Sequence, residues 1–285
     1  MRICRTPAEM HSACRELRQF GRTLGLVPTM GALHEGHMSL VAAARRGCDA
    51  VAASIFVNPT QFGPNEDYAA YPRTFEEDCR KLEQADVDLI FAPAAEEMYP
   101  AGNTTFVDPG EIATRLDGAS RPGHFRGVAT IVTRLFNIVQ PDRAYFGQKD
   151  AAQVAVLRHI VRDLNLPVDL VVCPIVREPD GLAMSSRNRY LTPAERKRAL
   201  VLSRALGRTA DLARSGEVSA EALIAAMQKL FPVDPHVRLD YAAVVDPDTL
   251  LPVDDISAGA LVAIAAWVGT TRLIDNLLLP PRSAQ

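Results

Sequence analysis

The chain has 285 residues, of which 48% are hydrophobic, and a formal net charge of −3. This length allows one large domain or two modest ones, and the hydrophobic share is sufficient for a sizeable core. Positive and negative side chains are interspersed without a basic stripe, which argues against a nucleic-acid partner. No apolar stretch is long enough to cross a bilayer, and the first residues carry no signal-peptide run. We therefore expect a cytoplasmic protein without a membrane partner.

The cysteines are consistent with a reducing compartment, because their spacing shows no pairing pattern and no Cys-x-x-Cys motif. They are Cys4, Cys14, Cys48, Cys79 and Cys173. A structural zinc site, which needs three or four nitrogen or sulfur ligands, is correspondingly disfavoured.

Strand and helix patterns alternate through about residue 176. The capping box Thr6-Pro7-Ala8-Glu9 predicts a first helix that runs to about Phe20, and Thr74 is expected to cap a later one. The predicted strands are 23–27, 51–57, 87–91, 143–146 and 170–176, and the other predicted helices are 37–46, 75–85, 127–139 and 150–164. This alternation predicts an α/β domain over residues 1–176, with a doubly wound, Rossmann-like parallel sheet.

Beyond residue 176 the pattern changes. The capping box Thr192-Pro193-Ala194-Glu195 predicts a helix to about Arg214, and a second helix over 220–230 is expected to stop at Pro232. Three strand-like runs follow, at 239–245, 261–268 and 272–278. Helices followed by consecutive strands predict a second, smaller α+β domain over residues 177–285.

His34-Glu35-Gly36-His37 lies where the first internal strand is followed by a helix. Two imidazoles three residues apart occupy one face of the helix start, where free N–H groups and the helix dipole favour an anion. Gly31 and Gly36 would let a flat ligand approach the backbone. The arrangement suggests a nucleotide that is cleaved. Taken alone, a zinc site or two solvated histidines would explain the tetrad equally well.

Two later clusters also follow predicted strands. Met184-Ser185-Ser186-Arg187-Asn188 combines two hydroxyls with a guanidinium, which is the chemistry of a phosphate clamp, although an ordinary polar loop has the same composition. Phe146-Gly147-Gln148-Lys149-Asp150 ends one strand and opens a helix, where Lys149 could equally be a solvated charge. Open parallel sheets bind ligands at the carboxyl ends of their strands, so the three clusters together indicate one crevice.

Five segments, which span most of the chain, resemble the pantothenate synthetase (pantoate–β-alanine ligase) family. This family belongs to the nucleotidyltransferase and class I aminoacyl-tRNA synthetase superfamily. The segments are 27–37, 54–62, 71–74, 145–150 and 176–191. The His-x-x-His tetrad and the Met-Ser-Ser-Arg loop mark only the superfamily, whereas Phe56-Val57-Asn58-Pro59-Thr60-Gln61-Phe62 narrows the match to this family.

The resemblance implies an AMP-forming ligase of pantothenate and coenzyme A biosynthesis. The carboxylate of (R)-pantoate would attack the α-phosphorus of ATP and expel pyrophosphate, and the amine of β-alanine would then displace AMP from the pantoyl-adenylate. The implied cofactors are ATP as substrate and Mg²⁺, and the implied partners are the small-molecule substrates and a second copy of the chain in a homodimer.

The resemblance also assigns residues. His34, His37, Lys149 and Arg187 would be catalytic. The ATP-binding set would be Met30, Gly31, His34, His37, Gly147, Lys149, Asp150, Val176, Met184, Ser185, Ser186 and Arg187. Pantoate or β-alanine would meet Met30, Asn58, Gln61 and Gln153, with Phe56 and Val132 as neighbours, unless Val132 is simply core.

Other positions are left open. Asp78, and less so Glu77, could hold a magnesium ion that is bound mainly by the ATP phosphates, the alternative being a solvated helix face. Tyr71 and His124 are also candidates for contact with a ligand, and the sequence leaves this contact open for both. The serines and arginine of the clamp lie at the expected join of the two domains, so domain closure would bring them onto the phosphates.

Two rival functions remain compatible with the motifs. A nucleotidylyltransferase would share the histidines and the clamp, but its acceptor pocket should be basic, whereas residues 58–62 offer amides and apolar groups. A non-catalytic ATP-binding module would need neither a second clamp nor an acid pocket. An aminoacyl-tRNA synthetase is disfavoured, because the chain has no evident tRNA-binding domain.

Overall fold

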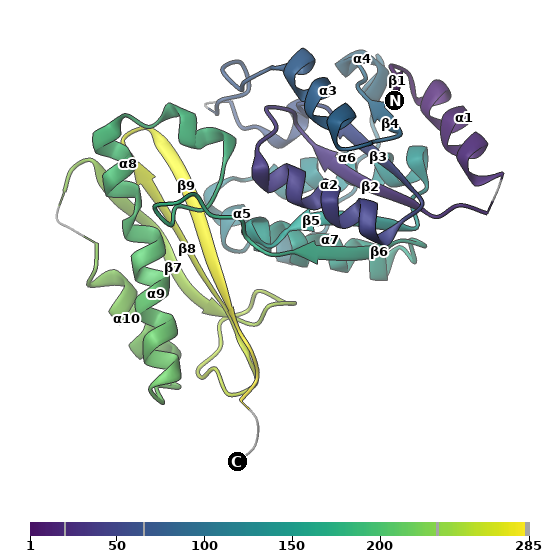
Figure 1. Cartoon of the computed structure of the whole chain (residues 1–285). Coiled ribbons are helices and arrows are strands. Elements are labelled where there is room, and N and C mark those ends of the chain that lie inside the picture. Colours follow the sequence, from purple (N-terminus) through teal and green to yellow (C-terminus); the bar gives the residue numbers. More distant parts are fainter. Residues whose placement is uncertain (20, 65, 232–233, 283–285) are drawn as a thin grey trace. The chain divides into compact units, whose positions relative to one another are not determined.

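The computed structural model describes residues 1–19, 21–64, 66–231 and 234–282, which form two compact units (Figure 1). The larger unit comprises residues 1–113, 121–147 and 156–174, and the smaller one comprises 114–120, 148–155 and 175–285. Two short segments that precede residue 156 thus group with the smaller unit. The contiguous boundary expected after residue 176 stays a prediction. Phe20 and Pro232, where two helices were expected to end, lie outside the described residues.

The larger unit is built on a six-stranded sheet in which every neighbouring pair is parallel. Its strands, from edge to edge, are β1 (Arg2–Cys4), β4 (Leu89–Phe91), β3 (Ala50–Ile55), β2 (Leu24–Thr29), β5 (Arg143–Gly147) and β6 (Asp169–Cys173). The chain winds outward from β2 in both directions, so the strand order reverses between β2 and β5, where open α/β sheets bind ligands. The expected doubly wound sheet is confirmed. β1 was missed, because three residues at an edge are too short to show a period.

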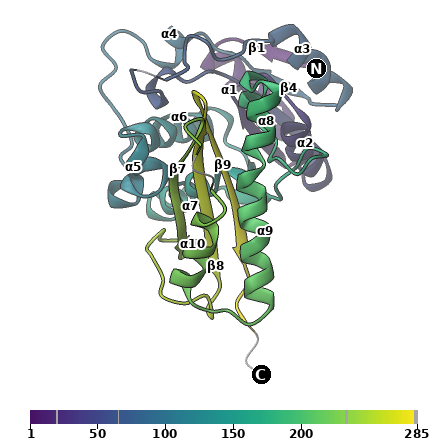
Figure 2. The same cartoon turned by 90° about the vertical axis from the view of Figure 1, so that its left-hand side faces the viewer.

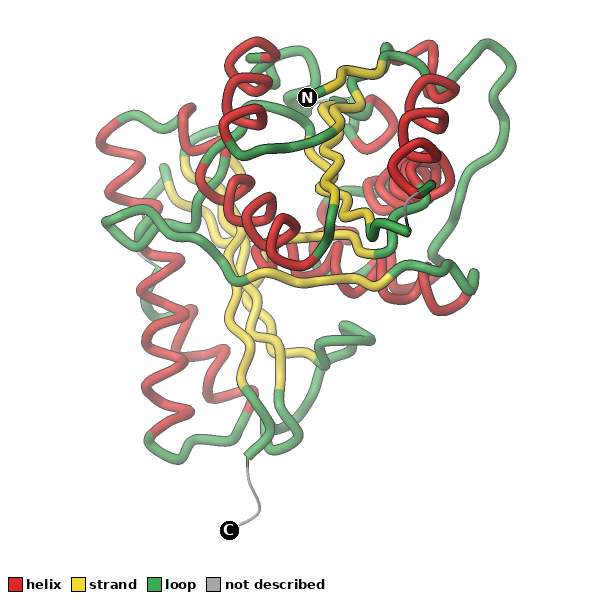
Figure 3. The backbone as a smooth tube through the Cα atoms, turned by 45° about the vertical axis from the view of Figure 1, so that its right-hand side comes forward, coloured by secondary structure: helices red, strands yellow, loops and turns green. Residues whose placement is uncertain are grey.

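Helices lie on both faces of this sheet, which Figure 3 shows as strands between two layers of helix. α1 (Pro7–Arg18) and α6 (His124–Val139) contact each other, and α2 (Glu35–Gly47) contacts α3 (Phe75–Gln84). Strand β2 is almost entirely buried between them, which explains its run of apolar residues. The remaining elements that begin before residue 175 are η1 (Pro59–Gln61), α4 (Ala95–Met98), η2 (Gly110–Thr114), α5 (Asp117–Ser120), η3 (Gln148–Asp150) and α7 (Ala151–Asp163).

The smaller unit has an antiparallel sheet of three strands, β7 (Val237–Val245), β8 (Ala260–Val268) and β9 (Thr271–Leu279). α9 (Val201–Arg214) and α10 (Ala220–Gln228) pack on one face of it (Figure 2). Buried Leu202, Leu223 and Ile264 join the helices to the sheet. The expected α+β organisation is confirmed.

The helix expected over residues 192–214 is instead two helices, because α8 (Pro193–Ala199) ends before Leu200 and α9 begins after it. The carbonyl of Leu200 accepts both the Arg204 N–H and the Ser203 hydroxyl, each at 3.1 Å, so the break is confined to Leu200 itself. Both expected capping boxes, at Thr6 and Thr192, are present. In the described parts of the chain no helix is both long and apolar enough to cross a membrane.

Candidate active site

The loop after β2 has an unusual backbone that is held by a buried carboxylate. Gly31 and Ala32 have φ angles of 82° and 51°, so the N–H groups of Ala32 and Leu33 both meet Asp78, at 2.9 and 2.8 Å. A Cβ on Gly31 would lie only 3.1 Å from a carboxylate oxygen of Asp78. Gly31 is therefore required by the left-handed backbone and by the close approach of Asp78, a reason that the sequence did not reveal.

Asp78 and its neighbours on α3 hold this loop in place. The Asp78 side chain is completely buried and also accepts a hydrogen bond from the Thr74 hydroxyl at 3.1 Å, so the alternative of a solvated helix face is wrong. Thr74 precedes the helix but makes no capping bond with its side chain. Lys81 donates to the carbonyl of Leu33 at 2.7 Å and pairs with Glu77. The loop is thus bound to α3 through both N–H and C=O groups.

Magnesium binding by Asp78 stays a prediction, and the geometry favours a structural role for this residue. Both of its oxygens already accept hydrogen bonds from the main chain. Across the described ranges, no group of three or more His, Cys, Asp or Glu side chains could hold a metal ion. The described residues thus offer no cluster of such side chains that would hold magnesium without the phosphates.

The two histidines stand together at the start of α2. His34 is the residue that precedes the helix, and its ring centroid lies 4.0 Å from that of His37. The main-chain N–H of His34 donates to Nδ1 of His37 at 3.3 Å. Because Nδ1 accepts, the proton of a neutral His37 lies on Nε2, where it can be donated to a phosphate oxygen.

Two amide side chains that follow β3 form a cluster with the thioether of Met30, the residue directly after β2. Nε2 of Gln61 lies 3.2 Å from Sδ of Met30, and Oε1 accepts from the Asn58 amide at 3.0 Å. The structure thus brings together Met30, Asn58 and Gln61, three of the four residues expected to bind pantoate or β-alanine. Since Met30 directly precedes Gly31, this cluster adjoins the loop before the histidines.

Asn58 is buried, and its amide is engaged by protein groups on both sides. It donates to Gln61 and to the carbonyl of Gly127, and it accepts from the Tyr99 hydroxyl at 2.7 Å. Burial raises the pKa of Tyr99, which keeps the hydroxyl protonated as a donor. Contact of Asn58 with substrate stays a prediction, whereas its hold on Gln61 is visible.

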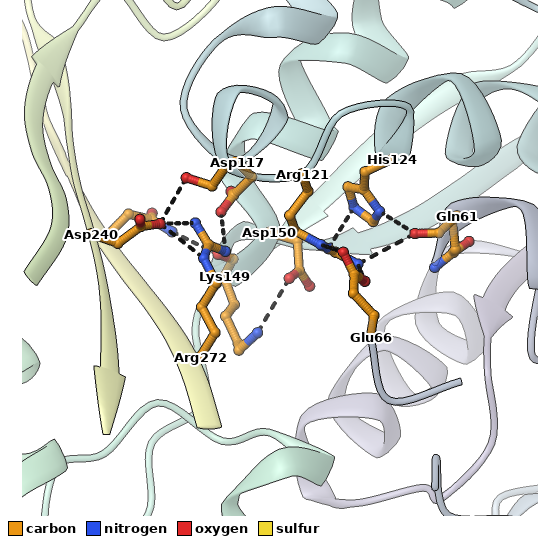
Figure 4. Close-up of polar contacts among 11 residues, drawn as sticks. Gln61, Glu66, Asp117, Arg121, His124, Lys149, Asp150, Asp240 and Arg272 are labelled. Atoms are coloured by element: carbon orange, nitrogen blue, oxygen red, sulfur yellow. Dashed lines mark hydrogen bonds and ion pairs between the residues drawn. The ribbon is translucent and has the colours of Figure 1, made fainter. Parts of the chain in front are cut away.

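His124 lies beside the main chain of Gln61 rather than its side chain. Figure 4 shows His124 between Arg121 and the Gln61 carbonyl, with Glu66 on the far side of the guanidinium. Tyr71 is buried with its ring edge-on to Phe62, and Phe56 and Val132 are buried as well. Ligand contact by these residues stays a prediction.

In the smaller unit, the segment that carries Lys149 is held by Asn276 of β9. The Asn276 amide donates to the carbonyls of Gln148 and Lys149, both at 2.9 Å, and accepts from the side chain of Gln148. The Lys149 ammonium pairs with Asp150 at 3.2 Å (Figure 4). Gln153 follows on α7 and is partly buried.

The expected phosphate clamp is also part of the smaller unit. The N–H of Met184 donates to the carbonyl of Val176 at 2.9 Å, which folds residues 176–184 back on themselves. Ser185 caps the short helix η4 (Ser186–Tyr190) through a bond from the N–H of Arg187. The Asn188 amide ties this turn to Glu178 at 2.6 Å. The clamp residues therefore lie on a turn that is closed by hydrogen bonds.

The predicted site residues divide between the two units. The larger unit contains Met30, Gly31, His34, His37, Asn58, Gln61, Asp78 and Gly147, and the smaller unit contains Lys149, Asp150, Gln153, Val176, Met184, Ser185, Ser186 and Arg187. Sequence reasoning missed Tyr99, Arg121 and Asn276. Each of them acts on residues far away in the chain, so no local pattern could have revealed them.

Comparisons with known proteins agree along the whole chain. The family model described as pantoate-beta-alanine ligase matches residues 2–278. A pantothenate synthetase from Acidobacterium capsulatum is 60% identical over 290 residues, covering 98% of this chain and 97% of its own. A pantothenate synthetase structure from Thermus thermophilus is 50% identical, with a TM-score of 0.92 over 99% of this chain and 100% of that one. A Francisella tularensis pantoate-beta-alanine ligase, complexed with beta-gamma ATP and beta-alanine, is 35% identical, with a TM-score of 0.78 over 98% and 97%.

Proposed function

Because the chain belongs to the pantoate–β-alanine ligase family, and is thus an ATP-dependent ligase of pantoate and β-alanine, we propose how its residues carry the reaction. The carboxylate of pantoate attacks the α-phosphorus of ATP, and the bond to the β-phosphate breaks to release pyrophosphate. The amine of β-alanine then attacks the pantoyl carbonyl, loses a proton and expels AMP. Pantothenate is the product.

One contact carries the proposal. The Gln61 amide meets Met30 at 3.2 Å, and the next residue, Gly31, opens the loop that leads to His34 and His37. A site for a small hydroxy acid, which needs amide donors and apolar walls, therefore adjoins a site for phosphate at a helix start. This is the neighbourhood that a carboxylate needs in order to attack a phosphorus atom.

The reaction needs no nucleophile from the protein, since the substrate carboxylate itself attacks. Catalysis is therefore positioning together with neutralisation of the charge on the phosphate oxygens. We assign the α-phosphate to His34 and His37, with Nε2–H of His37 as a donor. Lys149 binds the phosphates, and Ser185, Ser186 and Arg187 bind the departing pyrophosphate. Gln61 and Gln153 orient pantoate.

Three expectations from the family resemblance remain part of the proposal. Magnesium would arrive bound to the phosphate oxygens of ATP and keep most of its waters, since the described residues form no cage for it. The chain would form a homodimer and act in the cytoplasm. Size-exclusion chromatography with light scattering measures the mass of the assembly, and 31.0 kDa would contradict the homodimer.

Isotope exchange tests the adenylate route. Purified enzyme with magnesium, ATP and pantoate should exchange labelled pyrophosphate into ATP while β-alanine is absent. Added β-alanine should then yield AMP and pantothenate in equal amounts. Formation of ADP and phosphate would indicate an acyl-phosphate route and overturn the proposal. Exchange at the same rate with and without pantoate would favour a nucleotidylyltransferase. The absence of any exchange would favour a non-catalytic ATP-binding module.

A further inference from the structure

We propose that His124 is a positioning residue for Gln61, acting as a neutral imidazole that Arg121 and Glu66 hold in one tautomer. The inference rests on the proposed role of Gln61 in binding pantoate. Gln61 lies in η1, a helix of three residues, which has too few bonds of its own to hold a side chain still. Apart from Asn58, which caps η1 and meets the Gln61 side chain, the groups that fix Gln61 come from elsewhere in the fold.

The main-chain carbonyl of Gln61 is held by two side chains, one from the first residue of α6 and one from the turn just before that helix. Nδ1 of His124 lies 2.8 Å from this oxygen, and Nη2 of Arg121 lies 3.3 Å from it. These residues are 63 and 60 positions away in sequence. The carbonyl thus has one short bond from an imidazole and one longer bond from a guanidinium.

The partners of His124 decide its protonation. A carbonyl oxygen only accepts, so Nδ1 must carry a hydrogen. Nε2 lies 3.0 Å from Nη1 of Arg121, and a guanidinium only donates, so Nε2 must be the acceptor. The ring is therefore uncharged, with its single proton on Nδ1. A doubly protonated ring would face the guanidinium with an N–H and lose this bond.

Glu66 orients the guanidinium that selects this tautomer. Its carboxylate meets Nε of Arg121 at 2.9 Å and Nη2 at 2.5 Å, a two-point contact that fixes the plane of the guanidinium. The Arg121 and Glu66 side chains are only 16% and 25% exposed, so solvent screens the pair weakly. The chain of contacts from Glu66 through Arg121 and His124 ends at Gln61 (Figure 4).

Close packing places α6 against η1 at a further point. A Cβ on Gly127 would lie 2.3 Å from the Thr60 carbonyl oxygen, so the helix and the η1 backbone are in direct contact. The Asn58 amide bridges the carbonyl of Gly127 and the side chain of Gln61, at 3.1 and 3.0 Å. The main chain of Gln61 is thus held by His124 while its side-chain amide is held by Asn58.

Pantoate-dependent pyrophosphate exchange without β-alanine tests the role of His124. His124→Ala should raise the KM for pantoate about tenfold, the loss expected for one positioning hydrogen bond, while the KM for ATP changes less than about twofold. His124→Asn should restore most of the affinity, because its amide nitrogen can take the place of Nδ1. His124→Gln, whose amide reaches the place of Nε2, should not. Arg126→Ala, an exposed change in the same turn of α6, is the control.

A double mutant separates positioning from general damage. In a Gln61→Ala background, His124→Ala should raise the KM for pantoate no further, because the side chain that it positions is gone. A further tenfold increase there, an equal rise in the KM for ATP, or failure of Asn to outperform Gln would overturn the inference. Unchanged pantoate affinity in Gln61→Ala alone would instead remove the proposed role of Gln61, and the inference with it. Thermal unfolding of each variant checks that it is folded.

Discussion

The carboxylate of Asp78 accepts the main-chain N–H of Leu33 at 2.8 Å, although 45 residues separate them. Leu33 is followed directly by His34, so this bond connects α3 to the loop that leads into the histidine pair. The carboxylate is buried and accepts two N–H groups and one hydroxyl, and the charge of an anion strengthens all three bonds. The stability of the loop therefore depends on a residue outside it.

Asp78→Asn tests that dependence. The amide replaces one acceptor with a donor that faces an N–H group, so we expect a loss of about 1–3 kcal/mol in the free energy of unfolding and a slower pyrophosphate exchange. Urea unfolding measures the loss. Glu77→Gln weakens the partly exposed pair with Lys81 and should cost less than about 1 kcal/mol. Recovery of exchange at high magnesium, with unchanged stability, would instead indicate a metal ligand.

His37→Ala should slow adenylation by about 10²–10³-fold, as removal of one preorganised donor at a developing charge does. Single-turnover formation of the adenylate measures this rate directly. His11→Ala, a partly buried histidine on α1, is the matched control and should keep the wild-type rate. A folded His37 variant that forms the adenylate at the normal rate would remove this residue from the mechanism.

Substitutions should separate nucleotide binding from acid binding. Lys149→Ala should weaken the binding of ATP, since a charged contact to phosphate is lost. Gln61→Ala should weaken the binding of pantoate and leave the affinity for ATP largely intact. Arg187→Ala should resemble the lysine variant and Gln153→Ala the glutamine one. Calorimetry gives the affinity for ATP, and steady-state kinetics give the pantoate dependence. Equal loss of ATP binding in all four would contradict the division.

Gly127→Ala should destabilise the protein because its methyl group would overlap the Thr60 carbonyl, at 2.3 Å. Overpacking of this kind costs about 1–3 kcal/mol, and displacement of η1 should also raise the KM for pantoate. Gly207→Ala is the matched control, since a Cβ there meets nothing within 4 Å and the residue lies within α9. That change should stabilise the helix by about 0.5–1 kcal/mol. Equal unfolding midpoints for the two variants would refute the packing argument.

Arg272→Met tests a buried charge cluster in the smaller unit. Arg272 meets Asp117 at 2.7 Å and Asp240 at 2.8 Å, with all three side chains at most 16% exposed (Figure 4). Removal of the cation leaves two carboxylates without this partner, so we expect a loss of about 3–5 kcal/mol in unfolding free energy. Arg214→Met, which breaks the exposed pair with Asp211, should cost less than about 1 kcal/mol. A similar small loss at Arg272 would show that the cluster contributes little.

Much of the architecture was predictable from local patterns. The alternation of apolar strands with capped helices predicted the parallel sheet, and the return to consecutive strands after residue 230 predicted the second sheet. The capping boxes at Thr6 and Thr192 were found because a cap and its partner lie three residues apart. The edge strand β1 and the break at Leu200 were missed, since a three-residue strand shows no period and an interruption of one residue does not change the pattern of a helix.

The sequence by itself also determined which residue types follow which strands, because the spacing of a motif can be read without knowledge of the fold. Only the tertiary structure decided which residues hold them in place. Asp78 bonds to Leu33, His124 to Gln61 and Asn276 to Lys149, and these pairs lie 45, 63 and 127 residues apart in the chain. Such pairings follow from strand order, helix packing and the path of the chain. No repeating pattern within a short stretch of sequence encodes these three features. A buried polar group must find a partner, but its chemistry does not say which one. Folding makes that choice.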